Sequence, residues 1–203
     1  YDAVNTRGWL LLAEHWDVDP GVLDAVARNL TLDLHLLHAD GTAETGLSHR
    51  QDYGTRAVPT RLIACYLLFD CLRPTPCFAA AARQLWRLAE APGDVLWTCY
   101  ALIKAAANQV ASPEVARGDA REPVRGSQAL PEDFALHLPL NGIWRLRRGA
   151  LSVSVFRATT RLMSFGYGHA MLRGVRINQT YFGGACGHFI GDDLCVDDGV
   201  VTV

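Results

Sequence analysis

The spacing of apolar residues changes once along this 203-residue chain, and the change limits the folds that it can adopt. Up to about residue 112, apolar side chains recur three or four positions apart, as on one face of a helix. From Phe134 they alternate with polar residues, as in a strand with one buried face. Helices followed by strands predict an α+β chain or two domains, because a parallel β/α fold needs strands and helices in alternation.

Helices are expected throughout residues 1–112. Asp19, followed by a proline, is a helix start signal, because the aspartate accepts an unpaired N–H and proline favours the first helical position. A third helix is expected over residues 55–72, a fourth opens at Pro76, and Asp94 can cap a fifth. Two of the connections are short, so the N-terminal domain is predicted to be an antiparallel helical array.

Strands are expected in the second half of the chain. Residues 113–133 are rich in Pro, Gly, Arg and Glu, which predicts a linker. Residues 134–203 are predicted to form an antiparallel β-sandwich that is incomplete at its C-terminus. Two strands, over 143–147 and 151–156, are expected to be joined by a turn, and a further strand is expected over 162–172.

Composition restricts the kinds of partner. The formal net charge is −2, so a dedicated nucleic-acid binder is not expected. The longest apolar runs fall short of a membrane span, so no membrane partner is expected. Six cysteines include no CxxC pair, which argues against a zinc ribbon. Lys104 is the only lysine, and the planar guanidinium of the many arginines suits carboxylate ligands.

Both ends of the chain look cut, because the sequence starts within a few residues of a predicted helix and stops on a strand-like run. The sequence is therefore expected to be a piece of a longer protein. A signal peptide on that protein would direct it to the periplasm or outside the cell, and without one it would be cytoplasmic. The pattern indicates no particular oligomeric state.

Residues 38–55 hold an unusual density of titratable groups between two apolar helical segments. One interpretation is a solvated connector, in which Glu44, Arg50 and Asp52 form salt bridges and Tyr53 packs at the start of the next helix. The other is a functional site. His38, at the end of the preceding helix, is expected to interact with helix carbonyls or the helix dipole.

Three motifs resemble polysaccharide lyases of the heparinase II/III-like and alginate-lyase-like type. Asp40-Gly41 followed by Glu44, Ser48 and Tyr53 is similar to a family loop of the form DG…E…S…Y. Residues 142–149 resemble the first hairpin of the family's β-sandwich, and residues 167–169 (Tyr-Gly-His) are weakly similar to its histidine-containing strand. The resemblance implies an incomplete α/α toroid joined to an antiparallel β-sandwich.

The sequence departs from the family pattern in two places. Residues 1–112 lack the Asn-His pair that these lyases commonly use to neutralise the substrate carboxylate. The sandwich strand lacks the paired histidines that bind zinc in some members. Because the spacing of histidines gives a divalent metal no support, no cofactor is expected.

The resemblance implies β-elimination of an acidic polysaccharide or oligosaccharide that contains uronic acid. This reaction needs a base, an acid for the leaving oxygen and positive groups on the carboxylate. Tyr53 is assigned to proton transfer and His49 to the role of base or neutraliser. Arg50 is assigned to the substrate carboxylate and Gln51 to a hydroxyl.

Three more residues are predicted to bind substrate. Trp9 would stack on a sugar ring, and Tyr167 and His169 would contact substrate if the strands fold over the helical cleft. Two other functions remain open. A glycoside hydrolase on an α/α toroid would use two carboxylates across a cleft, and the sequence offers only Asp40, Glu44 and Asp52 in one loop. A non-catalytic carbohydrate-binding or structural protein would need no such pair.

Overall fold

The computed structural model describes residues 2–48, 53–91, 93–111, 130–181 and 184–203. The chain combines helices with an antiparallel sheet, as predicted for an α+β protein. It divides into a helical unit, Tyr1–His35 with Val58–Leu130, and a sheet unit, Leu36–Ala57 with Pro131–Val203. None of the helices in the described part of the chain is long and apolar enough to cross a membrane.

The division differs from the expected domains in one respect. Residues 36–57, which were expected within the helical domain of residues 1–112, belong to the sheet unit. We call Leu36–Ala57 the connecting segment. It contains most of the stretch that the sequence marks as a candidate site.

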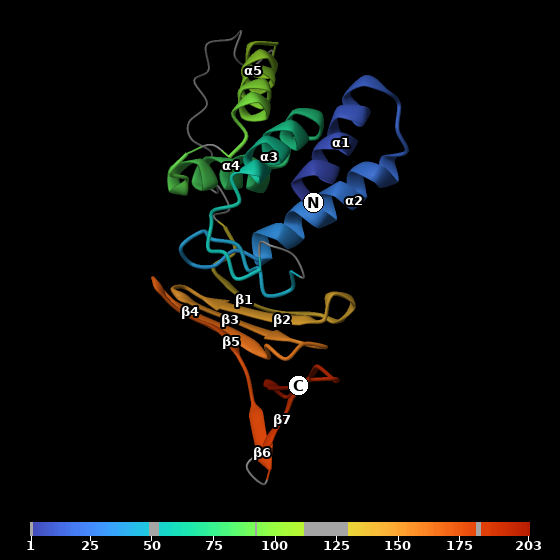
Figure 1. Ribbon diagram of the computed structural model, residues 1–203. Coiled ribbons are helices and arrows are strands. Elements are labelled where there is room, and N and C mark those ends of the chain that lie inside the picture. Colours follow the sequence, from blue (N-terminus) through green and yellow to red (C-terminus); the bar gives the residue numbers. More distant parts are fainter. Residues whose placement is uncertain (1, 49–52, 92, 112–129, 182–183) are drawn as a thin grey trace. The chain divides into compact units, whose positions relative to one another are not determined.

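The helical unit is built around its third helix. The described helices are α1 (Asp2–His15), α2 (Pro20–His35), α3 (Arg61–Leu72), α4 (Pro76–Leu88) and α5 (Val95–Ala111). Helix α3 contacts α1, α4 and α5, and most of its residues are buried (Figure 1). It is apolar on all sides rather than along one stripe, which is typical of a central helix.

Three predicted helix starts are confirmed and one is wrong. Helix α5 begins at Val95, directly after Asp94. Prolines occupy the first positions of α2 and α4, where a missing N–H costs nothing. Helix α3 begins at Arg61 and not at residue 55. The intervening residues form no helix, and the carbonyl of Ala57 accepts a hydrogen bond from the backbone N–H of Ala43 at 3.1 Å. This pairing within the connecting segment competes with the helix.

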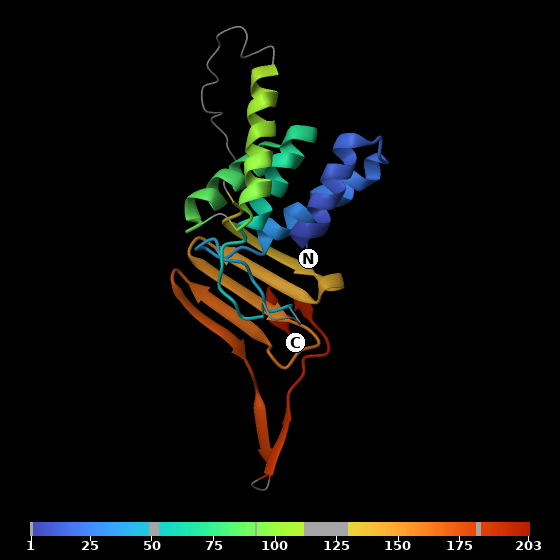
Figure 2. The same cartoon turned by 45° about the horizontal axis from the view of Figure 1, so that its top comes forward.

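The sheet unit contains one five-stranded antiparallel sheet in the order β1-β2-β3-β4-β5 (Figures 1 and 2). Its strands are β1 (Asp133–Leu138), β2 (Ile143–Arg148), β3 (Leu151–Phe156), β4 (Met163–Tyr167) and β5 (Ala170–Val175). A short 3-10 helix, η2 (Pro139–Asn141), joins β1 to β2. Two further pairs follow: β6 (Asn178–Tyr181) with β7 (Gly184–His188), and β8 (Cys195–Asp197) with β9 (Val200–Thr202).

The predicted hairpin of β2 and β3 is confirmed, with Gly149 at a φ of 55° in its turn. The single strand expected over 162–172 is wrong. A turn at Gly168, with a φ of 59°, divides that stretch into β4 and β5. A positive φ suits glycine because it has no Cβ, so the glycine next to Tyr167 was a turn signal.

The sheet buries its polar face. Residues opposite one another in antiparallel strands project on the same side, so the register defines two faces. In strands β2, β3 and β4, one face, which we call the covered face, is almost fully buried and consists of Ile143, Arg145, Arg147, Ser152, Ser154, Phe156, Ser164 and Gly166. Five of these eight residues carry charged or hydroxyl side chains.

The opposite side, which we call the open face, carries the larger apolar side chains. In strands β2, β3 and β4 its apolar residues are Trp144, Leu146, Leu151, Val153, Val155, Met163, Phe165 and Tyr167. All are half-buried or exposed; Phe165 is 39 % exposed and Tyr167 64 %. This is the reverse of the usual arrangement, in which the apolar face of a two-sided sheet is buried.

Candidate functional site

The connecting segment lies over the covered face of the sheet in both views (Figures 1 and 2). Its first leg, which we define as residues 38–46, follows β3. A Cβ atom on Gly46 would overlap the ring of Phe156, so only glycine allows this approach of the backbone. Its second leg, residues 53–57, runs beside β5 and the turn before it.

The carboxylate of Glu44 is the centre of a hydrogen-bond network on the covered face. Its Oε2 accepts hydrogen bonds from the hydroxyls of Ser154, at 2.5 Å, and of Ser164. Its Oε1 accepts the backbone N–H of Gly46 at 2.8 Å. Because the Glu44 side chain is only 4 % exposed, these bonds replace the water that the carboxylate loses on folding.

Arg145 supplies the positive charge beside this carboxylate. Its Nη1 lies 3.9 Å from Glu44 Oε2 and donates to the hydroxyl of Ser154 at 2.8 Å. Its Nη2 donates to the carbonyl of Leu37 at 2.9 Å. Burial lowers the pKa of Arg145 to about 10, although Glu44 opposes the shift, so the guanidinium stays charged at neutral pH.

His38 is the third member of the network. Its Nδ1 lies 2.5 Å from the hydroxyl oxygen of Ser152, and its Nε2 lies 3.5 Å from Glu44 Oε2. Burial, helped by the charge of Arg145, lowers the pKa of His38 to about 4 against the attraction of Glu44 and Asp40. The imidazole is therefore neutral at pH 7. We assign its proton to Nε2, which faces the carboxylate, so that Nδ1 accepts from the serine hydroxyl.

Glu44 remains ionised within the network. Burial alone would raise the pKa of this carboxyl group. The hydrogen bonds from Ser154 and Ser164, together with His38 and Arg145, outweigh burial and hold the pKa below its ordinary value. The network thus contains one anion and one cation, and it joins the connecting segment to β2, β3 and β4.

Tyr53 lies at the other leg of the segment, against β5. The guanidinium of Arg161 stacks on its ring, with the guanidinium carbon 3.4 Å from the ring centroid. Gly174, at a φ of 61°, faces the phenol, and a Cβ there would lie 3.3 Å from the hydroxyl oxygen. Tyr53 is half-buried. Its hydroxyl faces Gly174, which has no side chain.

Two more arginines surround this leg. Arg173 donates from Nη1 to the carbonyl of Gly54, and its Nη2 is screened from solvent but has no hydrogen-bond partner among the described residues. Arg56 pairs with Asp40 and donates to the backbone carbonyl of His169 at 2.7 Å. Within the described part of the chain, no carboxylate pairs with Arg161 or Arg173. The second leg is therefore a phenol among cationic groups.

One hydroxyl links the two legs. Thr45 Oγ1 accepts the backbone N–H of Gly54 at 3.0 Å and donates to the carbonyl of Thr55 at 3.2 Å. The backbone also pairs Glu44 N–H with Leu36 carbonyl at 2.8 Å. The leg that carries Tyr53 is thus bonded to the leg that Glu44 holds on the sheet.

The predicted site residues have different positions. His49, Arg50 and Gln51 lie outside the described residues. Trp9 is on α1 of the helical unit and is 48 % exposed. Of the predicted residues in the sheet unit, Tyr53 and His169 lie beside the same arginine-lined leg.

Tyr167 and His169 differ from their predicted strand arrangement. Tyr167 ends β4 on the open face of the sheet, opposite in direction to the side chains of the covered face. His169 is exposed in the turn between β4 and β5 rather than on a strand beside Tyr167. The turn at Gly168 separates the two residues.

Two expectations about the candidate stretch are wrong. His38 was expected to interact with helix carbonyls, but its side chain bonds Ser152 of β3 and is 3 % exposed. Glu44 was expected in a solvated connector, but it is buried under hydroxyl groups. Arg145 and Arg147 alternate with apolar residues in β2, and Ser152 and Ser154 do so in β3. These two patterns in neighbouring strands were a signal for a polar face.

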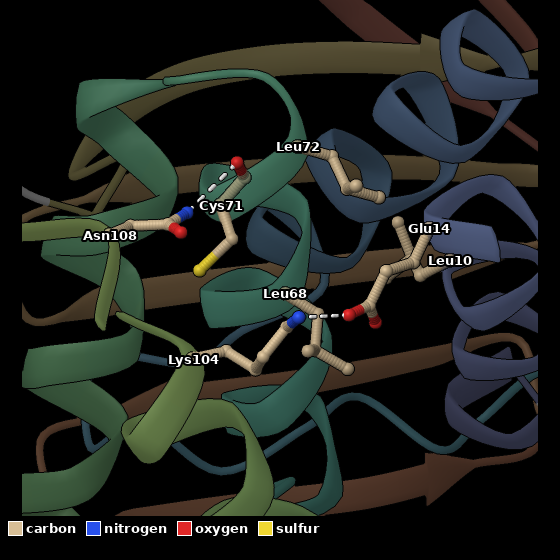
Figure 3. Close-up of a pocket in the computed structure, with 7 residues that line it drawn as sticks. All are labelled: Leu10, Glu14, Leu68, Cys71, Leu72, Lys104 and Asn108. Carbon is tan, nitrogen blue, oxygen red and sulfur yellow. Dashed lines mark hydrogen bonds and ion pairs between the residues drawn. The ribbon is translucent and has the colours of Figure 1, made fainter. Parts of the chain in front are cut away.

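A separate polar cluster lies in a small cavity of the helical unit (Figure 3). The cavity has a volume of about 110 Å³ and is lined by Leu10, Glu14, Leu68, Cys71, Leu72, Lys104 and Asn108. Glu14 pairs with Lys104 and accepts a hydrogen bond from the hydroxyl of Tyr100 at 2.8 Å. These bonds outweigh burial and keep the pKa of Glu14 below its ordinary value. The cluster is satisfied internally, so we interpret it as structural.

The described residues contain no group of three or more His, Cys, Asp or Glu side chains that could hold a metal ion. The expectation that no cofactor is needed stays a prediction. Comparisons of the chain with protein-family models, with curated proteins and with solved structures found no match.

Proposed function

We propose that this protein cleaves a uronic-acid-containing glycan by β-elimination, with Tyr53 as a proton-transfer residue. The stacking of the Arg161 guanidinium on the Tyr53 ring carries the proposal, because it puts a cation beside a group that can exchange a proton. The buried Nη2 of Arg173, without a partner among the described residues, supports the same function. It is a hydrogen-bond donor suited to a substrate carboxylate.

The reaction has clear requirements. The C5–H bond of the uronate breaks, a double bond forms between C4 and C5, and the C4–O bond breaks as its oxygen takes up a proton. A cation on the carboxylate makes the C5 proton more acidic by stabilising the negative charge that develops there. Arg161 and Arg173 are suited to that role, and Tyr53 to carrying the proton. The predicted roles are kept for His49 as base or neutraliser, for Arg50 as carboxylate ligand and for Gln51 as hydroxyl ligand.

The finer architecture is part of the proposal. We assign the helices to an incomplete α/α toroid and the five-stranded sheet to one layer of a β-sandwich, as the family resemblance implies. The large apolar side chains on the open face support a second layer, because a sandwich buries such a face between two sheets. The acidic glycan would be the partner of the sheet unit.

A non-catalytic carbohydrate-binding protein is the second candidate. The lack of an Asn-His pair in residues 1–112 favours it, since these lyases commonly use that pair. A glycoside hydrolase has less support. Asp40 is engaged by Arg56 and Glu44 by two serines, so neither described carboxylate of the segment is available for acid–base chemistry.

Tyr53→Phe tests the proposed function. With polyuronates as substrates, we expect the natural protein to produce unsaturated sugars, seen as new ultraviolet absorbance. The variant should lose that product, by about 10²- to 10⁴-fold in rate, because it lacks the transferable proton. Tyr100→Phe, which removes a hydroxyl in the helical unit, is the matched control and should keep the activity.

Other outcomes identify the competing functions. Binding of polyuronate without new absorbance, unchanged by Tyr53→Phe, would indicate a carbohydrate-binding protein. Release of reducing sugar without new absorbance would indicate hydrolysis.

Substitution of Arg173 should weaken binding of acidic sugars. We expect Arg173→Met to raise the Kd for an oligouronate by about 10- to 100-fold, because a hydrogen bond to a charged group contributes about 1.5–3 kcal/mol. Calorimetric titration measures this change. The exposed Arg87 of α4 provides the control variant, Arg87→Met. Equal affinities of the two variants would remove Arg173 from the site.

A further inference from the structure

We infer that Thr45 is a positioning residue for Tyr53, because its hydroxyl bonds the leg that carries Tyr53 to the leg that Glu44 anchors on the sheet. Its effect on catalysis rests on the proposed function, whereas its effect on the position of Tyr53 does not. Nothing in the sequence marks this threonine, which is half-buried between two more conspicuous groups.

The anchor on one side of Thr45 is firm. Glu44, the preceding residue, is held by the hydroxyls of Ser154 and Ser164 from two neighbouring strands. Its backbone N–H donates to the carbonyl of Leu36, and its Oε1 accepts the N–H of Gly46. The peptide group before Glu44 and the one after Thr45 are thus fixed, and a rigid support is what a positioning group requires.

The bonds on the other side converge on the residue that follows Tyr53. The N–H of Gly54 donates to Thr45 Oγ1 at 3.0 Å, and its carbonyl accepts from Arg173. The carbonyl of Thr55 accepts the proton of the Thr45 hydroxyl at 3.2 Å. The hydroxyl is therefore used both as acceptor and as donor. Arg173 holds the peptide group that follows Gly54 from the direction of the sheet, next to the Tyr53–Gly54 peptide group that Thr45 holds.

The geometry at Tyr53 depends on this peptide group. Arg161 contacts only the ring face, and Gly174 offers no side chain that would hold the phenol laterally. A stacked cation fixes the distance to the ring better than its rotation, because the attraction to the ring is not a directed bond. We therefore assign the backbone at Gly54, and with it Thr45, the control of where the hydroxyl of Tyr53 lies.

Two substitutions separate the hydroxyl from the shape of the side chain. Thr45→Val keeps the branched shape and removes both hydrogen bonds. Thr45→Ser keeps the hydroxyl and removes the methyl group. Thr31→Val is the matched control, since its hydroxyl bonds only the carbonyl of Ala27 in its own helix, at 2.8 Å.

Three measurements are made on the full chain. Amide exchange of Gly54 by NMR reports the bond to Thr45 directly. The chemical shifts of the Arg161 side chain report stacking, because the ring current of Tyr53 displaces them. The kcat and KM for polyuronate report the reaction.

We expect Thr45→Val to accelerate exchange of the Gly54 amide by about fivefold, since one hydrogen bond contributes about 1 kcal/mol. The Arg161 shifts should move toward those of an arginine in a short peptide, where no aromatic ring stacks on the guanidinium. We expect kcat to fall by about 10- to 100-fold, because small displacements of a reacting group are costly, with KM little changed. Thr45→Ser should keep the Gly54 exchange rate, the Arg161 shifts and kcat of the natural protein, and Thr31→Val should change none of the three.

The inference has definite contrary outcomes. Unchanged Gly54 exchange and Arg161 shifts in Thr45→Val would overturn it, whatever the activity. Altered shifts with an unchanged kcat would show that Tyr53 needs no positioning, which also overturns it. Altered shifts and exchange, in a natural protein that forms no unsaturated product, would support the placement of Tyr53 by Thr45 while rejecting the proposed lyase.

Discussion

Glu44→Ala should destabilise the sheet unit by about 3–5 kcal/mol, the loss found when one partner of a buried ion pair is removed. The substitution removes the carboxylate beside the fully buried Arg145 and deprives Ser154 and Ser164 of their acceptor. Each of these buried groups then bears a desolvation cost that the carboxylate had offset. The change also frees the first leg of the connecting segment from β3 and β4.

Hydrogen exchange of the β3 and β4 amides measures this loss. It is preferable to a single denaturation curve, because a chain of two units need not unfold in one step. Glu132→Ala, an exposed carboxylate of the same unit, is the control and should change stability by less than about 0.5 kcal/mol. A loss below about 1 kcal/mol in Glu44→Ala would show that other contacts hold the segment on the sheet.

Acid should destabilise the same unit before ordinary carboxylates are protonated. His38 has a pKa of about 4 in the folded protein against 6.5 for the free side chain, because burial and Arg145 disfavour its charged form. Between these two values the unfolded chain binds a proton that the folded chain rejects. Stability is therefore unaffected by His38 above pH 6.5 and falls as pH drops toward 4, by about 3 kcal/mol in all. Below the ordinary pKa of Glu44, protonation of that carboxyl adds to the loss.

His38→Gln should remove most of this dependence, since an amide does not titrate and can still donate to Glu44. Urea unfolding followed at the NMR signals of β3, at a series of pH values, measures the effect. His15→Gln, on an exposed histidine of the helical unit, should keep the dependence of the natural protein. If the imidazole of His38 titrates near pH 6.5 in the folded protein, burial does not lower its pKa and the expected acid destabilisation is wrong.

Local signals predicted much of the helical part and the central hairpin. Proline at the first helical turn located α2 and α4, and alternation located β2 and β3. These features depend on interactions between residues close in sequence, so local sequence patterns can predict them. The start of α3 was missed because the pairing of Ala43 with Ala57 is a tertiary preference that overrides helix formation.

The covered face was missed for a different reason. Valines alternating with serines in β3 predict that the valines are buried, yet Ser152 and Ser154 are. The serines are buried because Glu44 and His38 supply partners that lie more than 100 residues away. Apolar periodicity is a local property of the sequence, so it cannot predict partners that are distant in sequence.

The candidate site was predicted in part. Tyr53 was selected from its residue type, but Arg161 and Arg173 were not, because only the fold brings the segment before β4 and strand β5 to it. Thr45 carried no signal at all, since threonine is common in exposed loops. Residue types can suggest which chemistry is present, whereas the groups that orient it depend on the register of the sheet.

The buried polar face also changes what aligns the strands. In most sheets a slip of one residue is opposed because it would expose apolar side chains. Here a slip of β3 would turn Ser152 and Ser154 outward and put valines beneath Glu44, so the penalty is an unpaired carboxylate instead. The connecting segment thus acts as a template for the sheet, and His38 must meet a serine 114 residues later. Contacts between residues so far apart in sequence form slowly, so the strands should align late in folding. The connecting segment precedes the strands in the chain and is therefore synthesised before them.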